Sequence, residues 1–529
     1  MPPAAPLEEV REQLEQFINI DNPFGPIAAD AIVSRPNLLN FFFRDVERLQ
    51  SAVRQRPALL VGRRGAGKTA YLNSVRLNPD CDVLPLNSAT VFREVLNHLA
   101  KTTGDFVENN AVLWEAVFLE AICLYYAGRI EGIAHPSSAS LGQRPTSLTG
   151  QIAWHDKLWR CVCREALPDV SHSPDEMLAQ KIERFQEETM PRVVHYLKKN
   201  GRKLFLLIDS LEELRISAEN QQEALKGLLV AVARYQTAWP RVDVQLCIPS
   251  ELMPTIEQFA ANPLKELSSR TLLRWSSREL LDIAAHRFNV YLHLYYPGEV
   301  ERLGFPKLAE SRPYGEKLRV LFKSQQVRNR LDQSEDVINY IVRHTQLLPR
   351  QLLIYLNDIF KRNVSRSQEA FKIESRYVVE SVQEHEGQLV TEVASAFRYI
   401  YPQTETILEA CVPNLRAVFS HAELEQVFRK HVCSVGVFDR HEFSEFRKMM
   451  FDLGVIGIVE EESPEGIVHA RFQYYAPGTR MPAVGQNASL AIHPVFCGVL
   501  GAQRVPHVSE ANQGRTNWKV VYPRGSIPE

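Results

Sequence analysis

Eight residues, Gly62 to Thr69, read GRRGAGKT and match the pattern G-x-x-x-x-G-K-[ST]. An apolar run over residues 57–61 comes directly before them, and residues 70–75 have the pattern of an opening helix. This order of strand, glycine loop and helix suits phosphate binding, because glycine permits positive φ and closely spaced backbone N–H groups can point at one anion. The pattern predicts a nucleoside-triphosphate site in a chain of alternating strands and helices.

Side chains of this loop are expected to divide the work of holding ATP and Mg²⁺. Lys68 is expected to reach the β- and γ-phosphates, and the Thr69 hydroxyl to bind Mg²⁺. The residues expected to surround the nucleotide are Gly62, Gly65, Ala66, Gly67, Lys68, Thr69 and Ala70.

A second apolar strand is predicted over residues 203–209, and it ends in an acidic cluster. Asp209 stands at the carboxyl end of this strand, where open α/β sheets bind ligands, and is expected to hold Mg²⁺ beside the glycine loop. Glu212 and Glu213 follow closely, so either could polarise the attacking water. The alternative is that both glutamates favour the first turn of the next helix through its dipole.

Strands and helices alternate from the loop to about residue 275, which predicts a parallel α/β sheet covered by helices on both sides. Helical patterns dominate afterwards, and the last portion reads as helices followed by a two-stranded ribbon, which suggests a winged helix. The expected domains are an N-terminal helical extension (1–30), the α/β core (31–275), a helical lid (276–384), a winged-helix-like domain (385–506) and a loosely attached tail (507–529).

The pair GRRGAGKT and LLIDSLEEL, about 140 residues apart, resembles the AAA+/STAND branch of P-loop ATPases, including the origin-initiator-like and NACHT-like types. The resemblance implies an ATPase with a helical lid. In AAA+ proteins the catalytic glutamate directly follows the aspartate, but here Ser210 stands there. D-S-L-E-E is similar to the NACHT form D-G-x-D-E, which favours Glu213 over Glu212 as the residue that activates water.

The same resemblance implies roles for three residues farther along the chain. Ser250, at the end of a predicted strand, stands where a sensor residue would meet the γ-phosphate. Arg270 stands where an arginine finger would reach a neighbouring subunit's site, although a solvated surface arginine is the plainer alternative. Arg350 follows Pro349 at a helix start and would face the nucleotide from the lid.

Composition limits the kinds of binding partner and the cellular compartment to be expected. Lys and Arg number 61 against 63 Asp and Glu, for a formal net charge of −2, so the strong basic footprint of a dedicated nucleic-acid binder is missing. The eight cysteines form no C-x-x-C pair, which argues for reduced thiols in a cytoplasmic protein. The start lacks the pattern of a secretory signal, and the most apolar helix-like stretch, 113–127, is too short to span a bilayer.

Residues 411–480 bear on whether the winged helix binds DNA. This stretch holds 8 Lys and Arg against 10 Asp and Glu, so its affinity for a phosphate backbone is expected to be weak. The first hypothesis is therefore an ATPase switch that acts on a protein partner or on its own oligomerisation, and family analogy suggests bacterial stress or phage defence. The alternatives are a DNA-binding initiator or loader, and a scaffold that binds ATP with little turnover.

Overall fold

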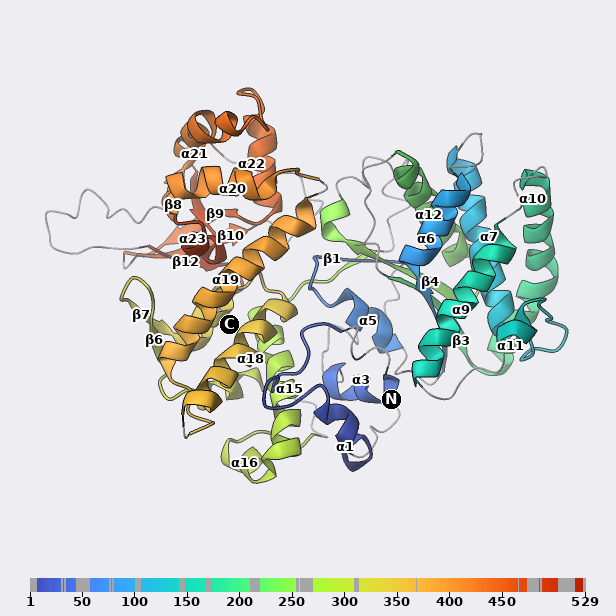
Figure 1. Cartoon of the computed structure of the whole chain (residues 1–529), viewed down its shortest axis with the longest axis horizontal. Helices are drawn as coiled ribbons and strands as arrows, with labels where there is room; N and C mark the ends of the chain where they lie inside the picture. Colours follow the sequence, from blue (N-terminus) through green and yellow to red (C-terminus); the bar gives the residue numbers. More distant parts are fainter. Residues whose placement is uncertain are drawn as a thin grey trace, which may run out of the picture. The chain divides into compact units, whose positions relative to one another are not determined.

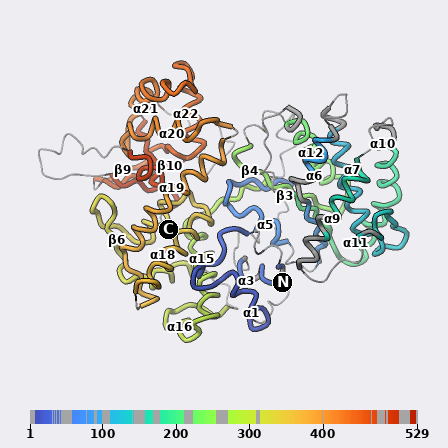
Figure 2. Tube along the Cα trace, viewed as in Figure 1, coloured from blue at the N-terminus to red at the C-terminus, as the bar shows by residue number. Residues whose placement is uncertain are grey.

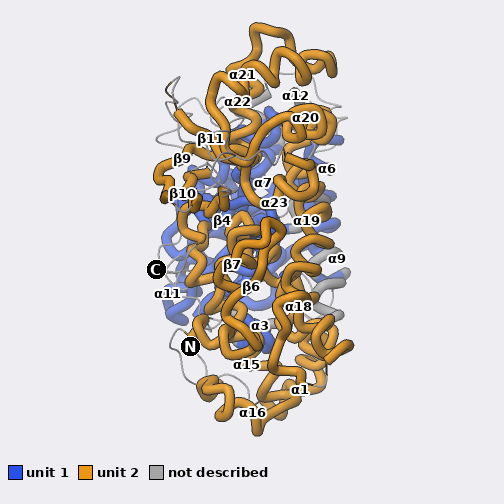
Figure 3. Tube along the Cα trace, turned by 90° about the vertical axis from the view of Figure 1, so that its left-hand side faces the viewer, with its two compact units in different colours: residues 1–5, 29–43, 47–273 blue, residues 6–28, 44–46, 274–529 orange. Residues whose placement is uncertain are grey.

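The computed structural model divides the chain into two compact units, and each is described here by itself. The first unit comprises residues 1–5, 29–43 and 47–273, and the second comprises residues 6–28, 44–46 and 274–529 (Figure 3). The residues that the structure describes are 7–29, 32, 35–43, 58–75, 78, 80–99, 106–141, 148–167, 174–209, 219–253, 256, 270–308, 314–367, 369–398, 400–464, 466–472, 485, 488–502 and 519–526.

A five-stranded sheet, with every strand pair parallel, forms the centre of the first unit. Parallel strands bring their carboxyl ends to one edge, so the segments that follow β1, β3 and β4 share that edge. This sheet confirms the predicted α/β fold. In spatial order its strands are β2 (Cys81–Asn87), β3 (Lys203–Asp209), β4 (Val242–Pro249), β1 (Leu59–Gly62) and β5 (Arg270–Leu272).

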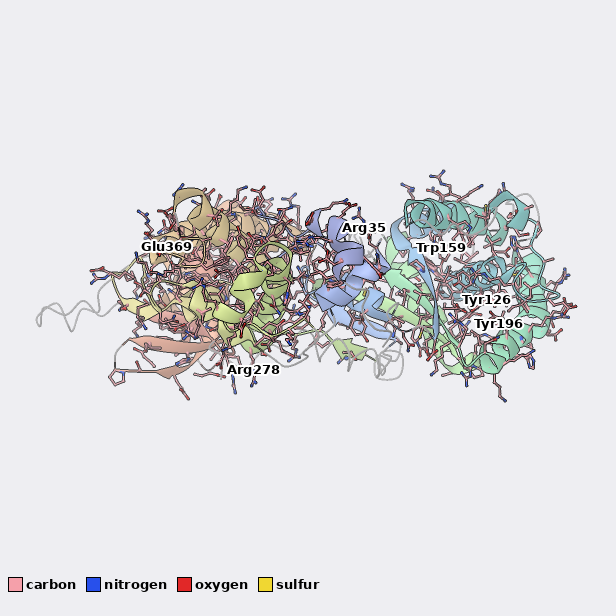
Figure 4. All side chains as sticks on the ribbon, turned by 90° about the horizontal axis from the view of Figure 1, so that it is seen from below. Arg35, Tyr126, Trp159, Tyr196, Arg278 and Glu369 are labelled. Atoms are coloured by element: carbon pink, nitrogen blue, oxygen red, sulfur yellow. The ribbon has the colours of Figure 1, made fainter. Side chains whose placement is uncertain are left out.

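Helices pack around this sheet, and Figure 2 follows the chain through them. A large apolar core joins the strands to α7, α9 and α12. Tyr126 of α7 and Tyr196 of α11 lie together, with ring centroids 5.7 Å apart, while Trp159 of α9 donates to the Pro85 carbonyl of β2 at 2.8 Å (Figure 4). The elements are α3 (Pro36–Phe43), α5 (Lys68–Ser74), α6 (Ser88–Leu99), α7 (Phe106–Tyr126), α8 (Ser138–Leu141), α9 (Leu148–Ala166), α10 (Pro174–Arg184), η2 (Phe185–Thr189), α11 (Met190–Lys199), α12 (Glu219–Ala238) and the short turn η4 (Ser250–Leu252).

The apolar helix α7 belongs to this core. Two of its carboxylates are paired: Glu115 accepts from Arg234 at 2.9 Å, and Glu120 lies 2.9 Å from Lys181. Pairing is what allows such groups to be buried, because an isolated buried charge costs several kcal/mol. Among the described residues, no helix is both long and apolar enough to cross a membrane.

The second unit begins with a helical portion that includes the N-terminal segment. Phe24 stacks on Phe288 with ring centroids 5.0 Å apart. Asn357 holds the neighbouring backbone, since its Oδ1 accepts from the Phe24 N–H at 2.9 Å and its Nδ2 donates to the Gly25 carbonyl at 3.0 Å. The elements, which Figure 1 labels in part, are α1 (Leu7–Glu15), α15 (Ser277–Tyr295), α16 (Pro297–Arg302), η5 (Gly315–Leu321), β6 (Gln326–Arg328), β7 (Ser334–Asp336), α17 (Val337–Arg343), α18 (Pro349–Arg366) and α19 (Ser375–Phe397).

The C-terminal portion of the second unit combines short helices with a five-stranded sheet in the order β12-β10-β9-β11-β8. Helices α20 to α22 precede the antiparallel hairpin of β9 and β10. The elements are α20 (Thr404–Cys411), η6 (Val412–Asn414), β8 (Val418–Ser420), α21 (His421–Val427), η7 (Phe428–Val432), η8 (Cys433–Val435), α22 (Phe443–Asp452), β9 (Ile456–Glu462), β10 (Ile467–Phe472), β11 (Ser489–Ile492), α23 (Pro494–Val499) and β12 (Val520–Pro523).

Strand β12 differs from the loose tail expected over residues 507–529. It is buried along its length and pairs in parallel with β10. The Tyr522 hydroxyl donates to Glu335 Oε2 at 2.6 Å, and Glu335 also accepts two hydrogen bonds of 2.8 Å from Arg343. Four apolar-leaning residues within a polar stretch were too few to reveal a strand, because their pairing partner lies about 50 residues earlier in the chain.

Candidate nucleotide-binding site

The glycine loop has the backbone that its sequence requires. Gly65 and Gly67 have φ values of 82° and 88°, a region that residues with a Cβ rarely adopt. A Cβ on Gly62 would lie 3.3 Å from the Leu273 Cβ and 3.4 Å from the Lys68 Cγ. Glycine is therefore favoured at 65 and 67 by conformation, whereas at 62 a Cβ would make its neighbours shift by a few tenths of an ångström. Helix α5 begins directly at Lys68.

The loop's own hydrogen bonds fix the lysine at its end. Lys68 is 4% exposed, and its Nζ donates to the Arg63 carbonyl at 3.1 Å. The Ala66 N–H donates to the same carbonyl at 3.0 Å. Thr69 is half-buried in the first turn of α5, and Ala70 is buried behind it. The residues of this loop predicted to hold nucleotide thus run without a break from the last residue of β1 to the first turn of α5.

Asp209 ends β3 and is half-buried at the carboxyl edge of the sheet that also carries the glycine loop. The strand order adds what the sequence could not show, because β4 lies between β3 and β1. At about 4.8 Å per strand, Asp209 stands roughly 10 Å from β1 across the sheet. Glu212 and Glu213, the two predicted activators of water, lie outside the described residues.

The end of β4 lies next to the loop, since Pro249 pairs with Gly62. Ser250 is buried, and its hydroxyl donates to Glu251 Oε2 at 3.2 Å. Its predicted contact with a γ-phosphate stays a prediction. Glu251, to which the sequence analysis gave no role, accepts a hydrogen bond of 3.0 Å from the Arg64 N–H. This contact depends on the pairing of β4 with β1, which the sequence does not show. The only indication of it in the sequence is an acidic residue at the end of a predicted strand.

The two arginines predicted to act on the nucleotide belong to other elements than the glycine loop. Arg270 is exposed at the first position of β5 and pairs with Leu59, so it lies at the amino end of β1 rather than at the loop. A finger that serves another subunit need not be near its own loop, and this role stays a prediction. Arg350 belongs to the second unit, in the first turn of α18, where it donates to Glu392 Oε1 at 2.8 Å. Its action on a γ-phosphate also stays a prediction.

The first turn of the helix after the loop is sealed against the sheet. Tyr71 is fully buried, and burial, with a smaller contribution from Cys247 of β4, raises the pKa of its hydroxyl. The phenol therefore stays neutral at physiological pH and acts as part of the core. The chemistry of this region consequently rests on the loop, Lys68, Thr69 and the carboxylates at the ends of β3 and β4.

Comparisons with known proteins give remote structural likenesses. No family model matches the sequence, and no curated protein matches it. A Walker-type ATPase of Pyrococcus abyssi is 12% identical, with a TM-score of 0.38 over 87% of this chain and 95% of that one. The ORC2 protein of Aeropyrum pernix, solved as ADPNP–ADP complexes, is 12% identical, with a TM-score of 0.39 over 85% and 89%. The ORC1 protein of Aeropyrum pernix, solved in complex with DNA, is 13% identical, with a TM-score of 0.34 over 89% and 95%.

These likenesses are too distant to assign a residue or an activity. The glycine loop with its two positive-φ glycines, the parallel sheet and the acid at the end of β3 are features of the chain itself. On those features the first unit has a P-loop NTPase fold.

Proposed function

We propose that this protein binds ATP with Mg²⁺ and hydrolyses it as a regulatory switch. The observation that carries the proposal is the folded glycine loop at the carboxyl edge of a parallel sheet, with Lys68 held inside the loop and Asp209 on the same edge. Backbone N–H groups of residues 65–69 would hold the β-phosphate, and Lys68 would neutralise charge on the β- and γ-phosphates.

The side chains offered to a metal ion suit Mg²⁺. Thr69 supplies a hydroxyl and Asp209 a carboxylate, both half-buried, and oxygen ligands with water in the remaining positions are what Mg²⁺ prefers. Bound there, Mg²⁺ would neutralise charge that develops on the phosphates. The remaining work falls to the chain itself, which must orient the nucleotide and a water molecule.

Glu213 remains our choice for the residue that polarises this water, with Glu212 second. Glu213→Gln keeps the shape of the side chain but removes the base, so we expect turnover to be lost and Mg·ATP binding to be kept. Glu212→Gln is the matched control and should hydrolyse ATP at close to the wild-type rate. Wild-type protein that binds ATP but shows no turnover, alone or with cell extract, would leave only the scaffold hypothesis.

Self-association or a protein partner is the favoured output of the switch. Nucleotide-dependent mass measurement, combined with an ATPase assay across protein concentrations, tests whether ATP drives oligomerisation. If Arg270 is a finger in trans, Arg270→Ala should abolish any rise of specific activity with concentration while leaving ATP binding intact. Unchanged concentration dependence in this variant would exclude the finger. The setting in bacterial stress or phage defence rests on family analogy alone.

DNA binding is the second candidate, and the helix–hairpin order of the C-terminal portion supports a winged helix there. The cations of α22 are already engaged within the protein. Arg447 contacts the His421 ring at 2.6 Å, and Lys448 pairs with Asp452 at 2.5 Å. The end of β9, next to the hairpin turn, carries exposed glutamates, of which Glu460 pairs with Arg471 at 2.7 Å. This helix is therefore poorly provided with cations for a phosphate backbone.

The DNA alternative has a direct test. Charge reversal at both Arg447 and Lys448 should leave DNA retention in a salt titration unchanged if the switch acts on protein. Loss of salt-sensitive binding in this double variant would instead establish the initiator or loader reading.

A further inference from the structure

Glu251 follows β4 directly and lies against the glycine loop. The short turn η4 (Ser250–Leu252) carries it past the strand end, next to the point where Pro249 pairs with Gly62. Its side chain is 4% exposed. A carboxylate is buried to this extent only where specific partners offset the loss of hydration, so its contacts indicate its role.

Each oxygen of this carboxylate has a partner. Oε1 accepts a hydrogen bond of 3.0 Å from the Arg64 backbone N–H and lies 4.0 Å from Arg63 Nε, while Oε2 accepts one of 3.2 Å from the Ser250 hydroxyl. Two of these three partners belong to the first turn of the glycine loop. The carboxylate therefore ties the loop to the neighbouring strand of the sheet.

One peptide group of the loop is held at both ends by these contacts. The Arg63 carbonyl and the Arg64 N–H belong to the same planar peptide unit. Its N–H donates to Glu251, and its carbonyl accepts from Lys68 Nζ at 3.1 Å and from the Ala66 N–H at 3.0 Å. Rotation of this peptide would break the contact with Glu251 and move the carbonyl that anchors the Lys68 ammonium.

We propose that Glu251 is a positioning residue of the ATP site, which fixes the Arg63–Arg64 peptide and through its carbonyl places Lys68. This inference rests on the proposed function for its effect on ATP. Glu251 does not touch the nucleotide in this role; it sets the backbone that does. The hydrogen bond to Arg64, rather than the negative charge, does the positioning.

Two substitutions separate the hydrogen bond from the charge. Glu251→Gln keeps an acceptor at Oε1, whereas Glu251→Met keeps the volume and removes the acceptor. We expect Glu251→Gln to bind Mg·ATP within about threefold of wild type and Glu251→Met to bind at least about tenfold more weakly. Glu115→Gln and Glu115→Met are the matched controls, because Glu115 is a buried, ion-paired carboxylate of the same unit and lies in the middle of α7. Both controls should bind Mg·ATP as the wild type does.

Amide hydrogen exchange at Arg64 provides a readout that needs no nucleotide. Protection should persist in Glu251→Gln and fall at least about tenfold in Glu251→Met. The proposal is overturned if Glu251→Met keeps both wild-type affinity and protection, or if Glu251→Gln loses as much as Glu251→Met. Should Glu251→Met fail to fold, a loss beyond tenfold in Glu251→Gln overturns it. If the wild type bound no ATP, the proposed function would fail, and the exchange measurement would still test the tie.

Discussion

At the scale of single residues, Lys68 is the side chain on which nucleotide affinity should depend most. It is buried at the end of the glycine loop with its ammonium anchored to the Arg63 carbonyl. We expect Lys68→Ala to weaken Mg·ATP binding at least about tenfold, because a charged hydrogen bond to phosphate is lost. Isothermal titration of the purified protein with ATP measures this. Lys157→Ala, at an exposed position of α9, should bind normally, and equal affinities for both variants would refute the site.

A second residue-scale expectation concerns pH and His344. The ring is buried, and its Nδ1 donates to the Tyr340 carbonyl at 2.7 Å. Burial first, and then the charge of Arg343, lowers the pKa of His344 well below its usual value. Glu386 lies 3.6 Å from Nε2, but this carboxylate is already bound by Arg330 at 2.6 Å and does not reverse the shift. His344 is therefore neutral in the folded protein.

The sign of the pH effect follows from this neutral ring. The unfolded chain takes up a proton near pH 6.5 and the folded chain does not, so the contribution is complete above that pH and is lost as the pH falls below it. From pH 7.5 to 5.5 the lost unfolding free energy is on the order of 1 kcal/mol. Urea unfolding should show His344→Asn losing less stability over this interval than wild type. Parallel losses in the two proteins would contradict the prediction.

At the scale of elements, the lack of a side chain at Gly498 lets α23 pack closely against α19. A Cβ on Gly498 of α23 would overlap Arg330 Nη1 and lie 2.5 Å from Glu386 Oε2 of the ion pair that these two residues form. We expect Gly498→Ala to destabilise the protein by about 1–3 kcal/mol, because the pair must separate. Gly387→Ala in α19 is the control, since nothing lies within 4 Å, and it should stabilise by about 0.5–1 kcal/mol. Thermal unfolding compares them, and equal midpoints would exclude this packing.

The sequence predicted those elements that have a contiguous pattern of residues. The glycine loop and β3 each carry a contiguous pattern, and the structure has a strand at 203–209 where one was expected. β4 (Val242–Pro249) ends directly before Ser250, which was expected at a strand end. No role could be assigned to Glu251 from the sequence, because its role depends on which strand neighbours β1. The periodicity of a single segment does not show the order of strands in a sheet. The same holds for β12, whose partner β10 is distant in the chain. The sequence therefore predicted elements with a contiguous pattern, but it did not predict which distant strands pair.

At the scale of the whole molecule, the second unit is discontinuous in the chain. Residues 6–28 belong to it together with residues 274–529, while residues 29–43 belong to the first unit. A fragment that starts at 274 would expose Phe288 and leave Arg287 without the carbonyls of Phe24 and Pro26, to which it donates at 3.4 and 2.9 Å. We expect such a fragment to aggregate or melt early, and to be rescued by a peptide of residues 6–28. Light scattering and thermal unfolding with and without the peptide decide this, and a stable fragment alone would contradict it.

The hydrogen bonds between Asn357 and the backbone of Phe24 and Gly25 also bear on the order in which parts of the protein fold during synthesis. The two partners of the Phe24 contact are 333 residues apart in the chain. At about 5–20 residues per second, a ribosome delivers Asn357 roughly 20 to 70 s after Phe24 has been synthesised. During that interval the apolar side chains of the N-terminal segment have no native surface to cover them. The segment around Phe24 thus reaches its final packing only after Asn357 has been made, and a chaperone would need to shield it until then.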